Sequence, residues 1–215
     1  MVAIRFEFTP KGAAAWLGER RQPTQIDVYF QITRSDRQIG HLLFEVKFSE
    51  SSFAGCRGWG AANPDRSRCL DVSAILSAPQ ANCWITEAEG RRYWEIMSRP
   101  DSSIRVEAIR SASGCPFRHG LYQMMRNRVL ADELVRHTGA DWADFAVCRH
   151  PGNKAAVTLD KPVSSTRNVI EAFRSLSSDH AGRDWNAAEL LATIRSTDNE
   201  LEDWESWMRA RYFVS

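Results

Sequence analysis

The stretch that decides the fold runs from Gln25 to Phe48 and reads QIDVYFQITRSDRQIGHLLFEVKF. Apolar residues alternate with other residues on both sides of a polar turn around Asp36, which predicts two half-buried strands joined as a hairpin. The alternation places one apolar set on a single face of the hairpin: Ile26, Val28, Phe30, Ile32, Leu42, Phe44, Val46 and Phe48.

Three charged residues, Asp27, Glu45 and Lys47, fall on the other face of this hairpin. If the turn centres on Asp36, Asp27 lies nearly opposite Glu45, with the two Cβ atoms about 5 Å apart. Two carboxylates that close repel each other, so a divalent cation is their natural partner. Lys47, two residues beyond the second carboxylate, is then expected beside that cation.

The alternative is a cross-strand salt bridge on the solvated face of a sheet, a common and weak arrangement. The chain has only four lysines among its 28 basic residues, and the other twenty-four are arginines. A lysine within an apolar strand is therefore unusual in this sequence. Its compact ammonium group can orient water or stabilise an anion in ways that arginine cannot.

A hairpin that carries Asp and then Glu-x-Lys resembles the core motif of the PD-(D/E)XK nuclease superfamily. The run from Gly18 to Phe53 is similar to one bacterial branch of it, the PGN_0703-like restriction-endonuclease-like proteins, and residues 121–127 resemble the helix after that core. The resemblance covers about residues 1–160, and Val46 departs from the aromatic residue expected there. The matching positions are Trp16, Glu19, Thr24, Asp27, Glu45, Lys47, Phe48, Ser49, Glu50 and Ser51.

The resemblance implies an α/β (α+β) fold with a restriction endonuclease-like mixed central β-sheet flanked by helices. Residues 1–160 would form the nuclease-like domain, and residues 161–215 a helical C-terminal extension packed on it. The activity implied is that of a Mg-dependent endonuclease, which hydrolyses phosphodiester bonds in nucleic acid, with DNA as the expected substrate. A homodimer would allow cuts in both strands.

The resemblance also implies a role for each residue of the site. Asp27 and Glu45 would bind Mg²⁺ or Mn²⁺, helped by the Val46 carbonyl, and Lys47 would orient the attacking water or stabilise the phosphate in the transition state. Two further residues are expected at the site. Glu19 would be an additional metal ligand or a nearby base, in competition with Glu7, and Gln123 would approach the metal from the following helix.

Three arginines, Arg57, Arg66 and Arg68, are candidate nucleic-acid contacts in the segment after the hairpin, although for any single one of them a solvated loop arginine is the more common case. The net charge of +1 gives no global attraction to nucleic acid. Acidic residues are concentrated after residue 160, which leaves the first 160 residues more basic. A nuclease needs a local basic rim of this kind.

Other function classes find less support. A catalytically inactive protein of the same fold, binding nucleic acid or a protein partner, is the main alternative. Cys115 and His119 are four residues apart, and a Cys–His hydrolase needs such a pair close together in space. Pro116 and Gly120 flank these two residues, however, and one Cys near one His is weak evidence for an active site. The sequence contains neither a Gly-x-x-x-x-Gly-Lys-Ser/Thr phosphate loop nor a Gly-x-Gly-x-x-Gly motif.

Length and composition fit one domain with an appendage, large enough to bury a sizeable core. No run of about 18 apolar residues and no signal peptide is visible, so a cytoplasmic location without membrane contact is expected.

The five cysteines contain no Cys-x-x-Cys pair, which argues against a zinc ribbon and favours reduced thiols. Some relatives of the superfamily carry an iron–sulfur cluster on four cysteines, an alternative open to Cys56, Cys69, Cys83 and Cys115.

The rest of the chain divides into further expected elements. Strands are predicted at residues 3–8, 144–148 and 157–159. Helices are predicted at residues 11–21, 70–76, 88–98, 117–137, 166–176, 185–195 and 198–212.

Overall fold

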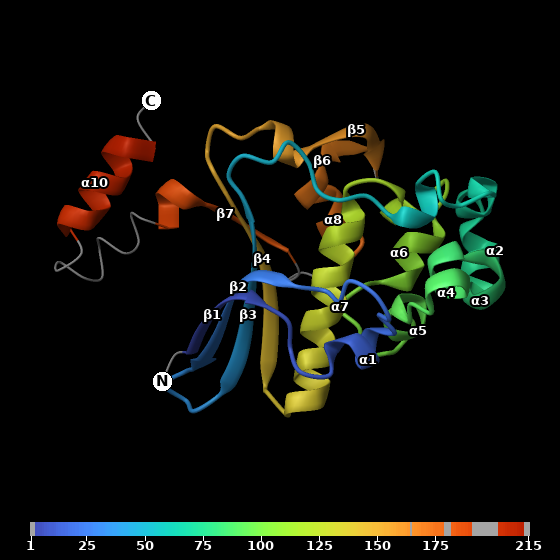
Figure 1. Ribbon diagram of the computed structural model, residues 1–215, viewed down its shortest axis with the longest axis horizontal. Coiled ribbons are helices and arrows are strands. Elements are labelled where there is room, and N and C mark those ends of the chain that lie inside the picture. The colour runs from blue at the N-terminus through green and yellow to red at the C-terminus, as the bar shows by residue number, and fades with distance from the viewer. Residues whose placement is uncertain (1–2, 164, 179–181, 191–201, 213–215) are drawn as a thin grey trace.

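The protein is described by a computed structural model for residues 3–163, 165–178, 182–190 and 202–212. Its centre is a five-stranded mixed sheet with the strand order β1-β2-β3-β4-β7 (Figure 1). The first three strands are antiparallel, whereas β3, β4 and β7 run parallel. This confirms the predicted restriction endonuclease-like fold class. The strands are β1 (Ala3–Phe8), β2 (Ile26–Thr33), β3 (Ile39–Lys47), β4 (Trp142–Arg149) and β7 (Arg183–Asn186).

The register of the central hairpin is the predicted one. Val28 of β2 pairs with Phe44 of β3, and Thr33 pairs with Ile39. The turn therefore centres on Asp36, as expected. One step beyond the last pair, the same register sets Asp27 opposite Glu45.

Helix α7 (Leu121–Thr138) connects the two parallel strands β3 and β4 and packs on both of them. Parallel neighbours require such a crossover. Its apolar residues recur every three or four positions, and all but Val135 are buried against the sheet or the neighbouring helices. The helix ends at Gly139, whose φ of 70° suits a left-handed cap.

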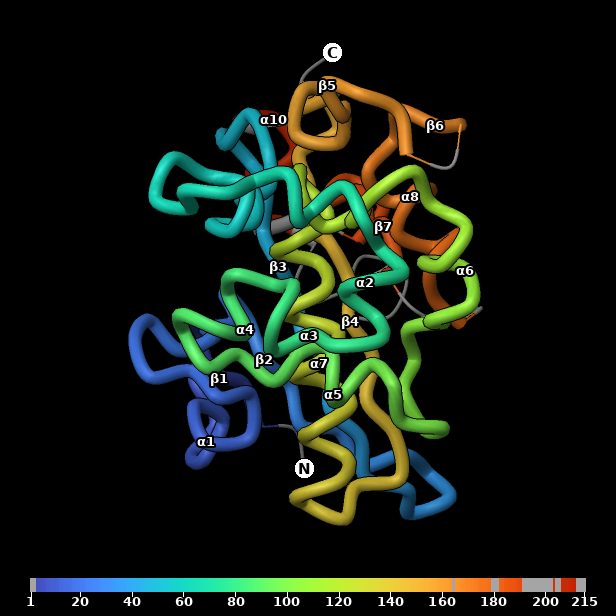
Figure 2. The backbone as a smooth tube through the Cα atoms, turned by 90° about the vertical axis from the view of Figure 1, so that its right-hand side faces the viewer, coloured from blue at the N-terminus to red at the C-terminus, as the bar shows by residue number. Residues whose placement is uncertain are grey.

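Short helices fill the long connection between β3 and α7 and lie on the side of α7 away from the sheet (Figures 1 and 2). The predicted helix over residues 88–98 is interrupted at Gly90, whose φ is 73°. Among the described residues, no helix has the length and apolar character to cross a membrane. Helix α1 (Ala13–Leu17) lies earlier in the chain, between β1 and β2. The short helices of the connection are η1 (Arg57–Trp59), η2 (Arg66–Leu70), α2 (Val72–Ser77), α3 (Pro79–Asn82), α4 (Trp84–Glu89), α5 (Tyr93–Met97), α6 (Val106–Arg110) and η3 (Pro116–Arg118).

The segment after residue 160 contains strands as well as helices. The predicted helix over residues 185–195 is wrong at its start, because β7 occupies Arg183–Asn186 and pairs with β4. Trp185 on this strand packs against Phe44, 5.0 Å between ring centroids, which favours the sheet over a helix here. Residues 191–201 lie outside the described residues, and the division at residue 160 stays a prediction. The other elements are η4 (Ala155–Val157), β5 (Thr158–Val163), β6 (Thr166–Asn168), α8 (Val169–Ser175) and α10 (Glu202–Tyr212).

The more buried face of the sheet is the one that carries the charged residues, and not the apolar face of the hairpin. The face that carries Glu45 and Lys47 also carries Tyr29 and Leu43, and it packs on α7 in the larger hydrophobic core. The face predicted to be the core holds a smaller cluster around Phe44. This second face is covered less completely, since Leu42 and Val46 on it are only partly buried. The charged residues therefore lie in the more buried layer.

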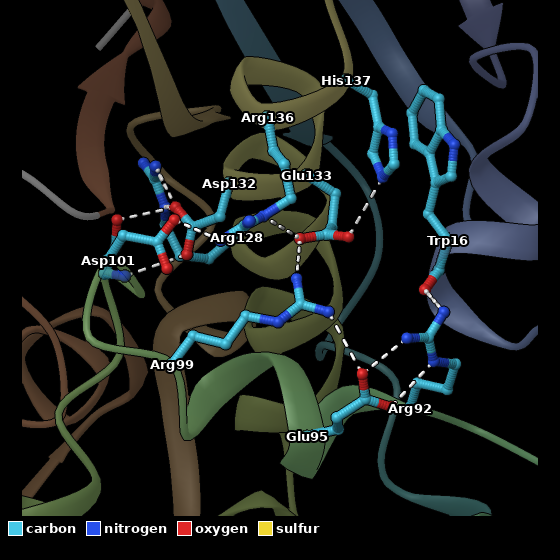
Figure 3. A network of polar contacts seen from close by, with 11 residues as sticks. Trp16, Arg92, Glu95, Arg99, Asp101, Arg128, Asp132, Glu133, Arg136 and His137 are labelled. Carbon is cyan, nitrogen blue, oxygen red and sulfur yellow. Dashed lines mark hydrogen bonds and ion pairs between the residues drawn. The ribbon is translucent and has the colours of Figure 1, made fainter.

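An ion-pair network fixes the C-terminal half of α7 to the short helices (Figure 3). Glu133, buried on α7, contacts Arg99 at 2.6 Å and Arg136 at 3.4 Å. Arg99 also reaches Glu95 of α5 at 3.2 Å. A buried carboxylate needs such partners to offset its lost hydration. The network therefore holds α7 in place while its N-terminal half faces the hairpin.

Candidate functional site

The end of the hairpin gathers the three charged residues that the sequence singles out. The ammonium nitrogen of Lys47 lies 2.9 Å from Oε1 of Glu45, and these two side chains are only 7% and 3% exposed. Asp27 Oδ2 accepts a hydrogen bond of 2.7 Å from the backbone N–H of Val46, the residue between Glu45 and Lys47. Glu45 and Lys47 are therefore buried and Asp27 is half-buried, in contrast to the solvated salt bridge of the alternative interpretation.

Helix α7 adds two amides to this cluster. Gln123 donates from Nε2 to Oε1 of Glu45, and Asn127 donates from Nδ2 to Oε2 of Glu45 over 2.9 Å. The structure thus brings Gln123 to the predicted site. Sequence reasoning missed Asn127, although a polar residue four positions after Gln123 lies on the same helix face.

The surroundings of Glu45 shift the pKa of its carboxyl group. Burial raises the pKa of its carboxyl, and the nearby negative charge of Asp27 raises it further. Lys47 and the amide of Asn127 act in the opposite direction, but the net pKa stays above the ordinary value. Above that pKa the ionised carboxylate opposes folding, and this cost disappears as the pH falls below the ordinary pKa of a glutamate. A charge kept at the expense of stability is typical of functional sites.

The donor set of the cluster suits a hard divalent cation. Asp27 and Glu45 offer carboxylate oxygens on facing positions, and the backbone of Val46 runs between them. In the described part of the chain, no group of three or more His, Cys, Asp or Glu side chains could hold a metal ion by itself. Mg²⁺ is commonly held by only one or two carboxylates, with waters and phosphate oxygens completing its shell. The residues present therefore fit a magnesium-type site.

The chain after β3 holds Lys47 in place. Its ammonium nitrogen lies 5.3 Å from the centre of the Phe53 ring and 3.8 Å from the Glu50 carboxylate. Asn153, just after β4, donates to the carbonyl of Glu50 over 2.9 Å and also contacts the Lys47 carbonyl at 3.3 Å. The loop beside the cluster is thus tied to two strands.

An open cavity of about 690 Å³ borders this loop. Phe53, which contacts Lys47, lines it together with Arg118, His119 and Lys154. Burial lowers the pKa of His119, and the positive charge of Arg118 lowers it further, so this imidazole is largely neutral at pH 7. The cationic Arg118 and Lys154 come from η3 and from the loop after β4, and their separation in the sequence hid them from pattern analysis.

Glu19 is buried in a polar cluster of its own. Its carboxylate accepts hydrogen bonds from Thr24 and Tyr93, and it pairs with Arg91 at 2.8 Å and with Arg126 at 3.6 Å. Arg126 belongs to α7, between the two amides that reach Glu45. Glu19 thus lies beside the same helix as the Glu45 cluster. Its own partners, however, are Thr24, Tyr93 and the two arginines. Its competitor Glu7 is exposed on β1.

The three arginines predicted to contact nucleic acid form no ion pair with the residues of the Glu45 cluster among the described residues. Arg57 pairs with Glu89 at 3.0 Å, and Arg68 pairs with Glu87 at 2.7 Å, both on α4. Arg66 is exposed at the start of η2. Their role in binding nucleic acid stays a prediction.

Comparison with known proteins identifies a single broad relationship. No curated protein and no solved structure matches the chain. A family model described as "Restriction Endonuclease associating with ARP" matches residues 1–213, a range that includes the hairpin, the short helices and α7. Because this match spans almost the whole sequence and agrees with the mixed sheet, the protein belongs to this family of restriction endonuclease-like proteins.

Proposed function

We propose that the protein is a metal-dependent nuclease of the PD-(D/E)XK type, in its PGN_0703-like branch, that hydrolyses phosphodiester bonds in DNA. The observation that carries this proposal is the cluster of half-buried Asp27 with buried Glu45 and Lys47, in which the lysine lies 2.9 Å from a carboxylate of raised pKa. Membership of a restriction endonuclease-like family supports the same chemistry.

The carboxylates of Asp27 and Glu45, with the carbonyl of Val46, are the groups that would hold Mg²⁺ or Mn²⁺. Such an ion, when bound, lowers the pKa of a coordinated water and neutralises charge that develops on the phosphate. The Gln123 and Asn127 amides keep Glu45 oriented, because each donates to a different oxygen of its carboxylate. Outer partners of this kind strengthen metal binding.

The ammonium group of Lys47 is the remaining catalytic element. In the free protein it pairs with Glu45, a contact that a metal ion would replace with its own positive charge. The lysine would then be available to orient a water molecule or to donate hydrogen bonds to a phosphate oxygen. Fixed donors in a buried site stabilise developing charge without reorganisation of solvent.

The cavity beside Phe53 is the proposed path of the substrate backbone. Lys154 is exposed there and Arg118 is held by a 2.8 Å hydrogen bond to the Cys115 carbonyl. Cations on the rim of a cleft bind phosphates regardless of sequence, with an affinity that falls as salt rises. We include Lys154 and Arg118 beside the predicted Arg57, Arg66 and Arg68 as candidate phosphate contacts.

Replacement of Asp27 by alanine tests the function directly. We expect purified wild-type protein to cleave plasmid DNA with Mg²⁺ or Mn²⁺ and to lose this activity in a chelator. Asp27→Ala should reduce cleavage at least about 100-fold, because it removes one of two metal-binding carboxylates. Binding of Mn²⁺, measured by calorimetry, should weaken in parallel.

The matched control is Glu107→Ala, which removes an exposed carboxylate on α6. It should cleave DNA like the wild type. Full activity in Asp27→Ala would refute the proposal. DNA binding without cleavage by the wild type, in either metal, would instead favour the catalytically inactive binding protein.

Asn127→Ala is expected to change the pH dependence of cleavage. Loss of the amide removes a donor that lowers the pKa of Glu45, so this pKa should rise further. The acidic limb of the pH–rate profile should move to higher pH, and metal affinity near neutral pH should fall about 10–100-fold. Rates measured across a pH series provide the test. An equal loss at every pH would mean that Asn127 acts only through packing.

A further inference from the structure

A second cavity, of about 310 Å³, lies beside the chain that follows Glu19, and we call it the arginine cavity. Its walls come from the chain after α1, from η1, and from α4 with the turn that follows this helix. Ligand pockets in proteins have volumes of about 300–1,000 Å³, so a small molecule or one unit of a polymer fits here. The charged and aromatic residues that line it are Arg20, Arg21, Arg57, Trp84, Glu89 and Arg91.

The arginine cavity carries an excess of positive charge. Four arginines line it together with the carboxylate of Glu89, which pairs with Arg57 at 3.0 Å and with Arg91 at 3.2 Å. Arg20 and Arg21 are exposed, and neither pairs with a carboxylate in the part of the chain that the structure describes. These two guanidinium groups are therefore available to bind an anion. A guanidinium group binds phosphate through two parallel hydrogen bonds, a geometry that lysine does not offer.

Close packing between the turn after α1 and the turn after α4 fixes the walls of this cavity. The guanidinium of Arg91, whose side chain is only 4% exposed, donates to the carbonyl of Arg21 over 3.0 Å. A Cβ atom at Gly18 would collide with the Gly90 carbonyl, so the two turns approach each other as only glycine allows. A Cβ atom at Gly90 would lie 3.4 Å from Nε of Arg20, which places this guanidinium over the second turn. Binding to walls that are already formed costs less entropy.

Trp84 adds an aromatic surface to these arginines. Its indole is partly exposed at the start of α4 and lines the cavity. Nucleic-acid bases stack on aromatic side chains and on guanidinium planes with little dependence on sequence. A phosphate alone would use the arginines but not the indole. The two together fit a ligand that carries both a phosphate and an aromatic ring, as a nucleotide does.

We propose that the arginine cavity binds one nucleotide, with its phosphate on Arg20, Arg21 and Arg57 and its base against Trp84. The nucleotide is either a free mononucleotide or one unit of the DNA strand at the nuclease site. Only the second of these sources rests on the proposed function.

Ion pairs connect the arginine cavity to the candidate nuclease site. Arg91 pairs with buried Glu19 at 2.8 Å, and Glu19 pairs with Arg126 of α7 at 3.6 Å. On the same helix, Gln123 and Asn127 lie on either side of Arg126 and donate to Glu45. A DNA strand cut at Glu45 would therefore find this cationic cavity on the neighbouring part of the protein.

Calorimetry with deoxyadenosine monophosphate, in the presence of a chelator, tests the proposal without nuclease activity. The wild type should bind this nucleotide, and it should bind deoxyribose phosphate at least about tenfold more weakly because no base reaches Trp84. The double variant Arg20→Gln with Arg21→Gln should bind the nucleotide at least about tenfold more weakly than the wild type. If it does not fold, Arg21→Gln alone replaces it. Asp27→Ala should bind like the wild type, which separates this cavity from the proposed nuclease site.

The matched control is Arg37→Gln, which removes an exposed arginine at the turn of the hairpin and should leave nucleotide binding unchanged. A single-stranded DNA oligonucleotide distinguishes the two sources. If the double variant binds it as weakly as it binds the mononucleotide, the ligand is a unit of the DNA strand, whereas unchanged oligonucleotide binding identifies a free mononucleotide. The proposal is overturned if the wild type does not bind deoxyadenosine monophosphate at millimolar concentration, or binds deoxyribose phosphate equally well. Unchanged nucleotide binding in the folded double variant would overturn it too.

Discussion

Lys47→Met should lower the rate of DNA cleavage by about two to three orders of magnitude, the range seen when one fixed donor to a transition-state charge is removed. The physical reason is twofold. The ammonium group that would face the phosphate is lost. Glu45 also loses the neighbouring positive charge that lowers the pKa of its carboxyl group, while burial and Asp27 still raise that pKa.

The fold should tolerate this change. Methionine has a similar length, and Glu45 can take up a proton once its cation is gone, so no unpaired buried charge has to remain. Thermal unfolding and single-turnover cleavage, measured on the same preparation, separate the two effects. Lys11→Met is the matched control, because Lys11 is exposed before α1. Cleavage by Lys47→Met at the wild-type rate would contradict the proposed role.

Glu19→Ala should lower the free energy of unfolding by about 3–5 kcal/mol, the usual cost of removing one partner from a buried ion pair. The side chain of Glu19 is fully buried, and that of Arg91, 2.8 Å away, is only 4% exposed. Arg126 and the Tyr93 hydroxyl would lose the same acceptor. Chemical denaturation measures the change.

Glu95→Ala serves as the comparison, because its side chain is 55% exposed and its pairs with arginine lie at the surface. It should cost less than about 1 kcal/mol. The comparison also distinguishes the two roles of Glu19. A stable Glu19→Ala protein that no longer binds Mn²⁺ would support the metal-ligand prediction, whereas an unstable one that binds it normally would make Glu19 a structural residue.

The sequence predicted the local elements best where the pattern was strong and the interactions were short-range. The hairpin turn at Asp36 and the long helix α7 follow from alternation and from helical spacing. Strand β7 was mistaken for helix because its pairing with β4 is a contact between distant segments. Local propensity gives way to such tertiary pairing.

The sequence by itself determined the composition of the candidate site: a hairpin that brings Asp27 opposite Glu45 with Lys47 two residues on. Only the tertiary structure decided that this face is the buried one, since α7 covers it. It also decided which distant groups join it, namely Asn127 at Glu45 and Lys154 at the cavity. The physical reason is that strand register is fixed by neighbouring residues, whereas burial and charge environment depend on how distant elements pack.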